Sequence, residues 1–180
     1  MSRLRTRWIA AFAGLVLAVC ALPLSASALG GSGTHVVITK TTLHIYAHRS
    51  FTVYTSSAGN RIYNPSHLGV GSLIMYADTD YSGTYASHSK SPIGTDVTLC
   101  EIASKQLLRC EGAFQLRKSL IVASNFSLPV EKLGTTRTIP LSSGTGVFAH
   151  ATGAVTSTVV EGNNLDLVVE ITRRTTVKNA

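Results

Sequence analysis

Residues 141–171 constrain the fold of this chain more than any other stretch, because they form a pattern of two strands joined by a tight turn. In the first strand, residues 154–160, the side chains of Val155, Ser157 and Val159 alternate with those of the residues between and after them. In the return strand, residues 165–171, leucine, valine or isoleucine occupies every second position. Residues 161–164, Glu-Gly-Asn-Asn, lie between the two strands and include residue types that tolerate positive φ. The pattern predicts an antiparallel hairpin.

The rest of the chain repeats this pattern of short β-like runs separated by polar segments. We predict strands at residues 34–54, 69–81, 97–102, 107–116, 120–128, 135–139, 154–160 and 165–173. Residues 56–68 are predicted as a loop and residues 82–94 as a polar, turn-like segment. The absence of a useful helical periodicity excludes α/β folds. We therefore predict an all-β fold, a closed antiparallel barrel of about eight strands, with an open sandwich as the alternative.

The first 28 residues have the pattern of a signal peptide. Three arginines precede an apolar run at residues 8–24, and residues 25–28, Ser-Ala-Ser-Ala, offer a small-residue cleavage site. We expect cleavage after residue 28, a secreted protein, and a single β-barrel domain at residues 29–180. The alternatives are an uncleaved membrane anchor and a lipoprotein box ending at Cys20, which the bulky residue before that cysteine disfavours.

The charge of the chain argues against nucleic-acid binding. The full chain has a formal net charge of +7, and loss of the three arginines in residues 1–28 leaves thirteen Lys and Arg against nine Asp and Glu, a charge of +4. These cations are scattered and are not interleaved with aromatic residues on a common face. We expect no nucleic-acid partner and no stable membrane association after cleavage of the signal.

Two cysteines remain once Cys20 leaves with the signal peptide. Cys100 ends one β-like run and Cys110 begins the next, with a polar connection between them. In an oxidising compartment this arrangement favours a structural disulfide. The alternatives are a metal pair, for which no further ligands stand at short spacing, and a reactive thiol.

Three patterns point weakly toward ligands. Residues 144–149 satisfy the dinucleotide pattern G-x-G-x-x-A, but a β-patterned segment follows where a helix would be needed, so we expect no cofactor. Residues 78–83 imitate the start of a calcium loop whose twelfth position would be Ser89, which cannot supply the required carboxylate. His44 and His48 would be about 13 Å apart on a strand, so we expect no metal site.

Residues 144–155 also carry a resemblance to a known family. Their sequence, Gly-Thr-Gly-x-Phe-Ala-x-Ala-x-Gly-x-Val, is similar to the signature of the allene oxide cyclase and dirigent superfamily, and the resemblance extends upstream through residues 69–81 and 110–116. It implies an antiparallel β-barrel around an apolar cavity, in which a reactive molecule is held in one productive shape. The sequence departs from the family at Thr152, where an arginine is common, and this departure weakens the case for dirigent radical coupling.

The resemblance suggests a function and a set of site residues. We expect a cofactor-free cyclase or isomerase that binds a hydrophobic, polyketide- or lipid-derived molecule in the cavity and directs its cyclisation, by a Diels–Alder, spirocyclisation or epoxide reaction. The alternatives are a dirigent-type or lipocalin-like carrier and a secreted structural or interaction protein, and the chain could form a dimer or a trimer. The candidate catalytic residues are Tyr76, Asp78 and His150, and the candidate ligand-binding residues are Ile74, Phe114, Phe126 and Phe148.

An enzyme and a carrier would differ in their inner wall. Ile74, Tyr76 and Asp78 alternate along one strand and therefore share one face. If that face lines a cavity, a desolvated carboxylate beside a phenol could act as an acid or a base. A carrier would have a wall that is apolar throughout, and an interaction protein would fill its barrel with its own side chains.

Overall fold

A computed structural model describes residues 34–129 and 134–178 of the chain. The predicted signal peptide at residues 1–28 lies outside the described residues. The described part consists of strands and three short 3-10 helices. The strands are β1 (Thr34–Thr55), β2 (Arg61–Ile62), β3 (Leu73–Thr84), β4 (Ser87–Ser104), β5 (Leu107–Leu116), β6 (Ser119–Pro129), β7 (Thr136–Pro140), β8 (Ser143–Gly144), β9 (Thr152–Val159) and β10 (Leu165–Lys178). The helices are η1 (Pro65–His67), η2 (Gly146–Phe148) and η3 (Glu161–Asn163).

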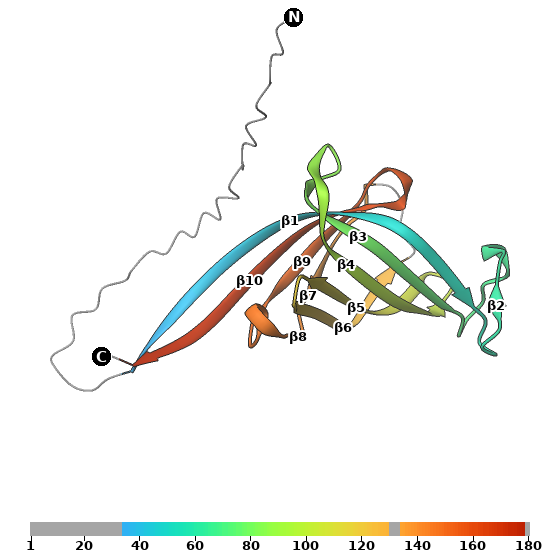
Figure 1. Cartoon of the computed structure of the whole chain (residues 1–180). Helices are drawn as coiled ribbons and strands as arrows, with labels where there is room; N and C mark the ends of the chain where they lie inside the picture. The colour runs from blue at the N-terminus through green and yellow to red at the C-terminus, as the bar shows by residue number, and fades with distance from the viewer. Residues whose placement is uncertain (1–33, 130–133, 179–180) are drawn as a thin grey trace, which may run out of the picture.

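These strands form one antiparallel sheet of ten strands (Figure 1). Its order is β7-β9-β10-β1-β3-β4-β5-β6-β8, with β2 attached to the end of β1. The all-β prediction is therefore confirmed. The predicted hairpin is confirmed as β9 and β10, in which Val159 pairs with Leu165 and Val155 pairs with Val169 across the turn formed by η3.

The two ends of the sheet meet at one segment of the chain rather than through a ladder of paired strands. β7 pairs with β9 and β8 pairs with β6, but no ladder in the described ranges joins β7 or β9 directly to β6. Between β7 and β8, the Leu141 N–H donates to the Gly153 carbonyl, and the Ser142 N–H donates to the Val122 carbonyl of β6. The prediction of a closed antiparallel barrel of about eight strands is thus confirmed in part. The sheet is antiparallel, but it has ten strands, and no ladder among the described residues joins its two ends.

Residues 82–94 differ from the prediction, because they are mainly strand and not turn. β3 continues to Thr84 and β4 begins at Ser87, so the turn is confined to two residues. Gly83 lies at a left-handed φ of 115°, and a Cβ atom there would come within 2.3 Å of the Ser87 carbonyl oxygen. The glycine therefore allows a close approach of the two strands, and the polar composition reflects a hairpin whose side chains are mostly in contact with water.

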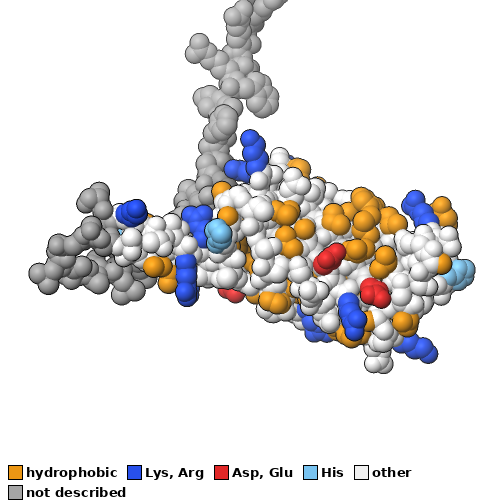
Figure 2. Space-filling view, turned by 90° about the horizontal axis from the view of Figure 1, so that it is seen from below, with side chains coloured by type: hydrophobic (Ala, Val, Ile, Leu, Met, Phe, Trp, Pro, Cys, Tyr) orange, Lys and Arg blue, Asp and Glu red, His pale blue; other side chains and the backbone are white. Residues whose placement is uncertain are grey.

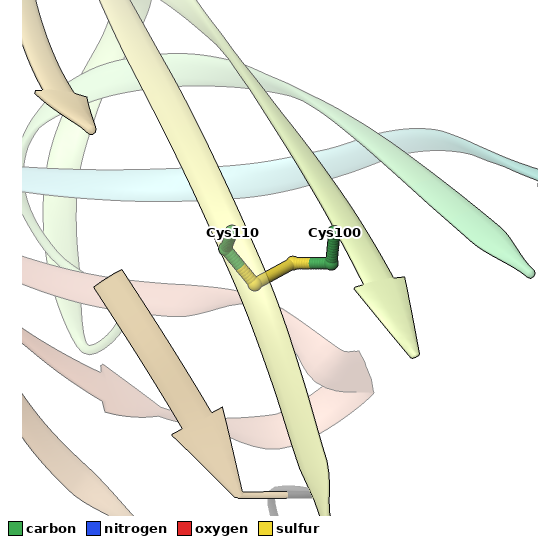
Figure 3. The surroundings of a disulfide bond; sticks show 2 residues. All are labelled: Cys100 and Cys110. Carbon is green, nitrogen blue, oxygen red and sulfur yellow. A yellow bond between two sulfur atoms is a disulfide. The ribbon is translucent and has the colours of Figure 1, made fainter. Parts of the chain in front are cut away.

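The interior of the sheet holds two groups of buried apolar side chains. The larger group brings together β1, β5, β6, β9 and β10, with Ile45, Ile121, Val155 and Val169 almost completely buried. The smaller group contains Ile74, Leu108 and the cysteines of β4 and β5. Cys100 and Cys110 lie directly opposite each other in the β4–β5 pair and form a disulfide, as Figure 3 shows, which confirms that prediction. No helix in the described part is long and apolar enough to cross a membrane.

Candidate functional site: an interior cavity beside a cluster of three carboxyl groups

The curved sheet surrounds a cavity of about 600 Å³. Side chains from β1, β3, β4, β5, β6, β7, β9 and β10 line it. The inward face of β3 contributes Ile74, Tyr76 and Asp78, the set that the alternation of the sequence places on one face. A cavity of this volume is within the range that takes a small organic ligand.

One part of the cavity wall is apolar. Ile74, Cys100 and Leu108 pack together there, and Tyr54, Ile102, Leu128 and Phe126 pack against them. Gly112 of β5 also lines the cavity and pairs with Ala123 of β6, another small lining residue. Two small residues at facing positions leave space that larger side chains would fill.

A β-bulge in β1 follows directly after an arginine that lines the cavity. Ile45 and Ala47 are buried on the inner face, and Arg49 follows them at the next inward position. The pairing with β3 then shifts between Arg49 and Phe51, and the even-numbered Thr52 and Tyr54 line the cavity instead. An extra residue in one strand reverses the alternation of its side chains, so the bulge keeps both halves of β1 facing the cavity.

Arg49 forms a charged pair with Asp78 and covers an aromatic ring. Its Nε donates to Oδ1 of Asp78 and its Nη2 donates to Oδ2 at 3.3 Å. Its guanidinium carbon lies 4.3 Å from the ring centroid of Tyr76, within the range of a cation–π contact. The guanidinium group of Arg49 therefore contacts both of the cavity residues Tyr76 and Asp78.

Two further carboxyl groups lie next to this pair. Asp96 of β4 is the direct cross-strand partner of Asp78 and also lines the cavity. Asp80 lies two positions after Asp78 on β3, is fully buried, and is within hydrogen-bonding reach of Asp96. No N–H or hydroxyl of the described residues donates to either oxygen of Asp80 or to Oδ2 of Asp96. A shared proton supplies the missing donor, because one carboxyl of the pair can donate to the other only when it is protonated.

The surroundings of these carboxyl groups favour their neutral forms. Burial raises the pKa of Asp78, although the hydrogen bonds and the charge of Arg49 oppose that rise. Burial also raises the pKa of Asp80 to about 7. For Asp96, burial and then the charges of Asp80 and Asp78 raise the pKa well above its ordinary value. Like charges this close cannot all ionise, so the Asp80–Asp96 pair holds a proton at neutral pH.

The residues predicted as site residues lie in two regions of the molecule. Tyr76 and Asp78, and the ligand-binding candidates Ile74, Phe114 and Phe126, all line the cavity. Phe148, at the end of η2, instead packs against the larger apolar group and is not part of the cavity lining. His150 is exposed, adopts a left-handed φ of 60°, and also lies outside the lining.

Sequence reasoning missed Arg49, Asp80 and Asp96. Asp80 carried a usable signal, because it continues the inward alternation of Tyr76 and Asp78. Asp96 lies between the segment read as a turn and the strand predicted from residue 97. Arg49 follows Ile45 and Ala47 at the next inward position, but the bulge directly after it breaks the alternation with Thr52 and Tyr54. Among the described residues, no group of three or more His, Cys, Asp or Glu side chains is arranged to hold a metal ion.

Solved structures with the same fold include enzymes and a dirigent protein. Pyocyanin demethylase matches with a TM-score of 0.55 and 16% identity, over 73% of this chain and 99% of that chain. A pterocarpan synthase dirigent protein matches with a TM-score of 0.53 and 11% identity, over 79% of this chain and 96% of that chain. A nonspecific heme-binding cyclase that catalyses a (4 + 2) cycloaddition during neoabyssomicin biosynthesis matches with a TM-score of 0.52 and 12% identity, over 74% of this chain and 64% of that chain.

These matches confirm the resemblance at the level of the fold, since the chain shares the fold of a dirigent protein and of a cyclase of known structure. No family model matches the chain, and no curated protein has a significantly similar sequence.

Proposed function

We propose that this protein is a cofactor-free cyclase or isomerase that binds a hydrophobic, reactive small molecule in its cavity and directs its cyclisation. The observation that carries the proposal is the position of Asp96, a buried carboxyl with a strongly raised pKa on the wall of an otherwise largely apolar cavity. Perturbed carboxyl groups in clefts are typical of sites that move protons.

The chemistry follows from the different environments of the carboxyl groups. Asp96 in its protonated form donates a hydrogen bond or a proton to a carbonyl, epoxide or hydroxyl oxygen of the bound molecule. Asp78, which pairs with Arg49, acts as the base and accepts a proton from the bound molecule. The apolar wall around Ile74 and Phe126 holds the carbon skeleton in a folded shape and excludes water, so that orientation supplies much of the acceleration.

Stereocontrol by binding alone is the second candidate function, and Arg49 is the observation that favours it. The resemblance to dirigent proteins implies cavity acids with an arginine, and Thr152 stands where that arginine is common. Arg49 brings a guanidinium to the cavity acids from β1 instead. In this alternative the cavity orients a reactive partner made elsewhere and transfers no proton itself.

The experiment that separates the two functions compares Asp96→Asn with the unchanged protein. The substrates are linear polyene carbonyl compounds that cyclise slowly without a catalyst, and binding of the neutral dye Nile red reports on the cavity. General acids contribute roughly 10² to 10⁴ in rate, so we expect Asp96→Asn to lose at least about 100-fold in rate and to keep its dye affinity.

Glu101→Gln is the matched control, because it removes a carboxylate from an exposed position of the same strand and should leave the rate unchanged. Binding of the polyenes with altered product stereochemistry but no acceleration would favour the stereocontrol function. No binding and no acceleration with any polyene or dye would contradict both functions.

A further inference from the structure

The sheet has an extension that the cavity does not use. Residues 34–40 of β1 pair with residues 172–178 of β10, and these two segments, here called the arm, run beyond the ends of the neighbouring strands (Figure 1). β3 begins to pair with β1 only at Ile45, and β9 pairs with β10 no further than Thr172. Among the described residues, the arm is therefore a ribbon of two strands.

This ribbon exposes branched apolar side chains on both of its faces. Val36 and Ile38, on the outer face, are 61% and 55% exposed, and Val37 and Val177, on the opposite face, are also exposed. In Figure 2 the narrow end of the molecule shows apolar side chains beside Lys and Arg side chains. A two-stranded ribbon is marginally stable in water without a further strand or layer.

Within the described residues the arm has a free edge on each of its two strands, and the edge on β1 carries fewer cations than the edge on β10. Between Val36 and His44, β1 pairs with β10 on one side, and no strand of the described residues pairs with its other side. The residues along this edge are mostly β-branched, and Lys40 is the one lysine or arginine among them. Long exposed edges of this composition are templates for pairing with another strand.

We propose that the arm is a dimerisation element, in which the β1 edge of one copy of this chain pairs antiparallel with the β1 edge of a second copy. A twofold axis at Val37 produces three successive apolar cross-strand pairs. Val37 faces the second copy's Val37, Val36 faces the second copy's Ile38, and Ile38 faces the second copy's Val36. The surface is the same on both partners, as a closed twofold dimer requires.

The charges of the arm are compatible with this register. The arm carries Lys40, Arg173, Arg174 and Lys178 and no carboxylate. Three of these four cations are on β10, away from the pairing edge. Lys40 faces the second copy's Thr34, so no like charges stand directly opposite each other on the paired strands. The result is a four-stranded sheet with its cations toward the outside.

The area buried between the two copies determines the affinity that we expect for the dimer. Two strand edges bury less than the roughly 800 Å² per partner of a standard stable interface. We therefore expect a reversible dimer with a dissociation constant of about 1 to 100 μM, at the weak end of specific interfaces. The measurement has to cover protein concentrations on both sides of this range.

Sedimentation velocity of the purified protein tests the proposal. We expect the mass to double with rising concentration for the unchanged protein, and Val37→Lys to remain a monomer because it places two lysines opposite each other on the twofold axis. Val177→Lys is the matched control, since it adds the same charge at an equally exposed position of the same face on β10, and it should still dimerise.

Crosslinking tests the register. Val37→Cys should form a disulfide-linked dimer under mild oxidation, because the two introduced cysteines face each other, and Val177→Cys should not. A protein that stays monomeric at all concentrations, or an oligomer that Val37→Lys leaves intact, would overturn the proposal. So would a monomer that instead binds vesicles containing anionic lipid through its arm cations.

Discussion

Asp80 is the residue whose position most needs explanation. It is fully buried on β3, where the cross-strand partner is Gly94, and neither of its oxygens accepts a hydrogen bond from an N–H or hydroxyl of the described residues. A buried carboxylate without a donor is costly, so it persists only in a protonated or proton-sharing form. Asp80 does not line the cavity, and we therefore regard it as a positioning residue that keeps a proton on Asp96.

This arrangement makes stability depend on pH in a specific direction. The pKa of Asp80 is about 7 in the folded protein, against 3.8 for an ordinary aspartate. Between these values the folded state holds a proton that the unfolded chain has lost, so the free energy of unfolding falls as the pH rises from about 4 to 7. We expect Asp80→Asn to make this slope less steep, because the raised pKa of Asp96 still contributes to it, and to raise the free energy of unfolding at pH 8 by roughly 2 to 4 kcal/mol. Urea denaturation between pH 4.5 and 8.5 measures both effects.

Glu101→Gln serves as the control for this measurement too, because it removes an exposed carboxylate from β4 and should keep the slope of the unchanged protein. If Asp80→Asn were less stable than the unchanged protein at pH 8, the Asp80 carboxylate would stabilise the folded protein, and the prediction would be wrong.

Among the elements, the β4–β5 pair forms the most firmly connected part of the cavity wall. Its disulfide joins directly opposed residues, and both sulfurs are buried against Ile74 and Leu108. Joining residues 100 and 110 restricts a short loop of the unfolded chain, which by loop-closure entropy is worth about 3 kcal/mol. The disulfide therefore stabilises the β4–β5 part of the cavity wall, which carries Asp96 and Phe114.

We expect the double variant Cys100→Ala, Cys110→Ala to lose about 3 kcal/mol or more in free energy of unfolding, measured by urea denaturation. The cysteines are 1% and 4% exposed, so a reductant should attack the disulfide only when the protein opens. Thiol labelling after brief reduction should thus be slow in buffer and fast in urea. Equal labelling rates in the two conditions would contradict the burial of this bond.

The elements also show which parts of the fold the sequence could predict. Alternation over residues 154–171 predicted the hairpin formed by β9 and β10, and alternation along residues 74–78 placed Ile74, Tyr76 and Asp78 on one face of a strand, which the structure shows to be the inward face of β3. The segment 82–94 was assigned to a turn, because its polar residues resemble loop composition when their strand partner is unknown. The position of Asp96 beside Asp78 depends on the β3–β4 register, and the change of alternation after Arg49 depends on a bulge. Both are tertiary features without a local sequence signal.

At the scale of the whole molecule, one sheet performs two separate tasks. Its curved part surrounds the cavity, and the segment between β7 and β8 connects the two ends of the strand order through Leu141 and Ser142. Its extended part, the arm, leaves the cavity region and presents a β1 edge with which no strand of residues 34–129 and 134–178 pairs. Because the arm is distant in register from Asp78 and Asp96, a change in the oligomeric state should leave ligand binding unchanged.

A substitution in the cavity wall tests directly whether the protein binds a ligand inside the curved sheet. Ala123 is 2% exposed, lines the cavity, and faces Gly112 across the β5–β6 pair. A phenylalanine at this position would project into the space that the two small residues leave open. We expect Ala123→Phe to reduce Nile red affinity at least about 10-fold, at a cost of roughly 1 to 3 kcal/mol in free energy of unfolding from local overpacking.

The matched control for this change is Val97→Phe, which adds a ring on β4 at a position that is 44% exposed and points away from the cavity. It should bind the dye as the unchanged protein does. If Ala123→Phe kept full affinity while remaining folded, the dye would bind on the outer surface, and a structural or interaction role would replace the cavity-based functions. If both variants lost dye affinity equally, binding would depend on the overall stability of the protein rather than on the space inside the sheet. Dye titration and urea denaturation should therefore be run on the same samples.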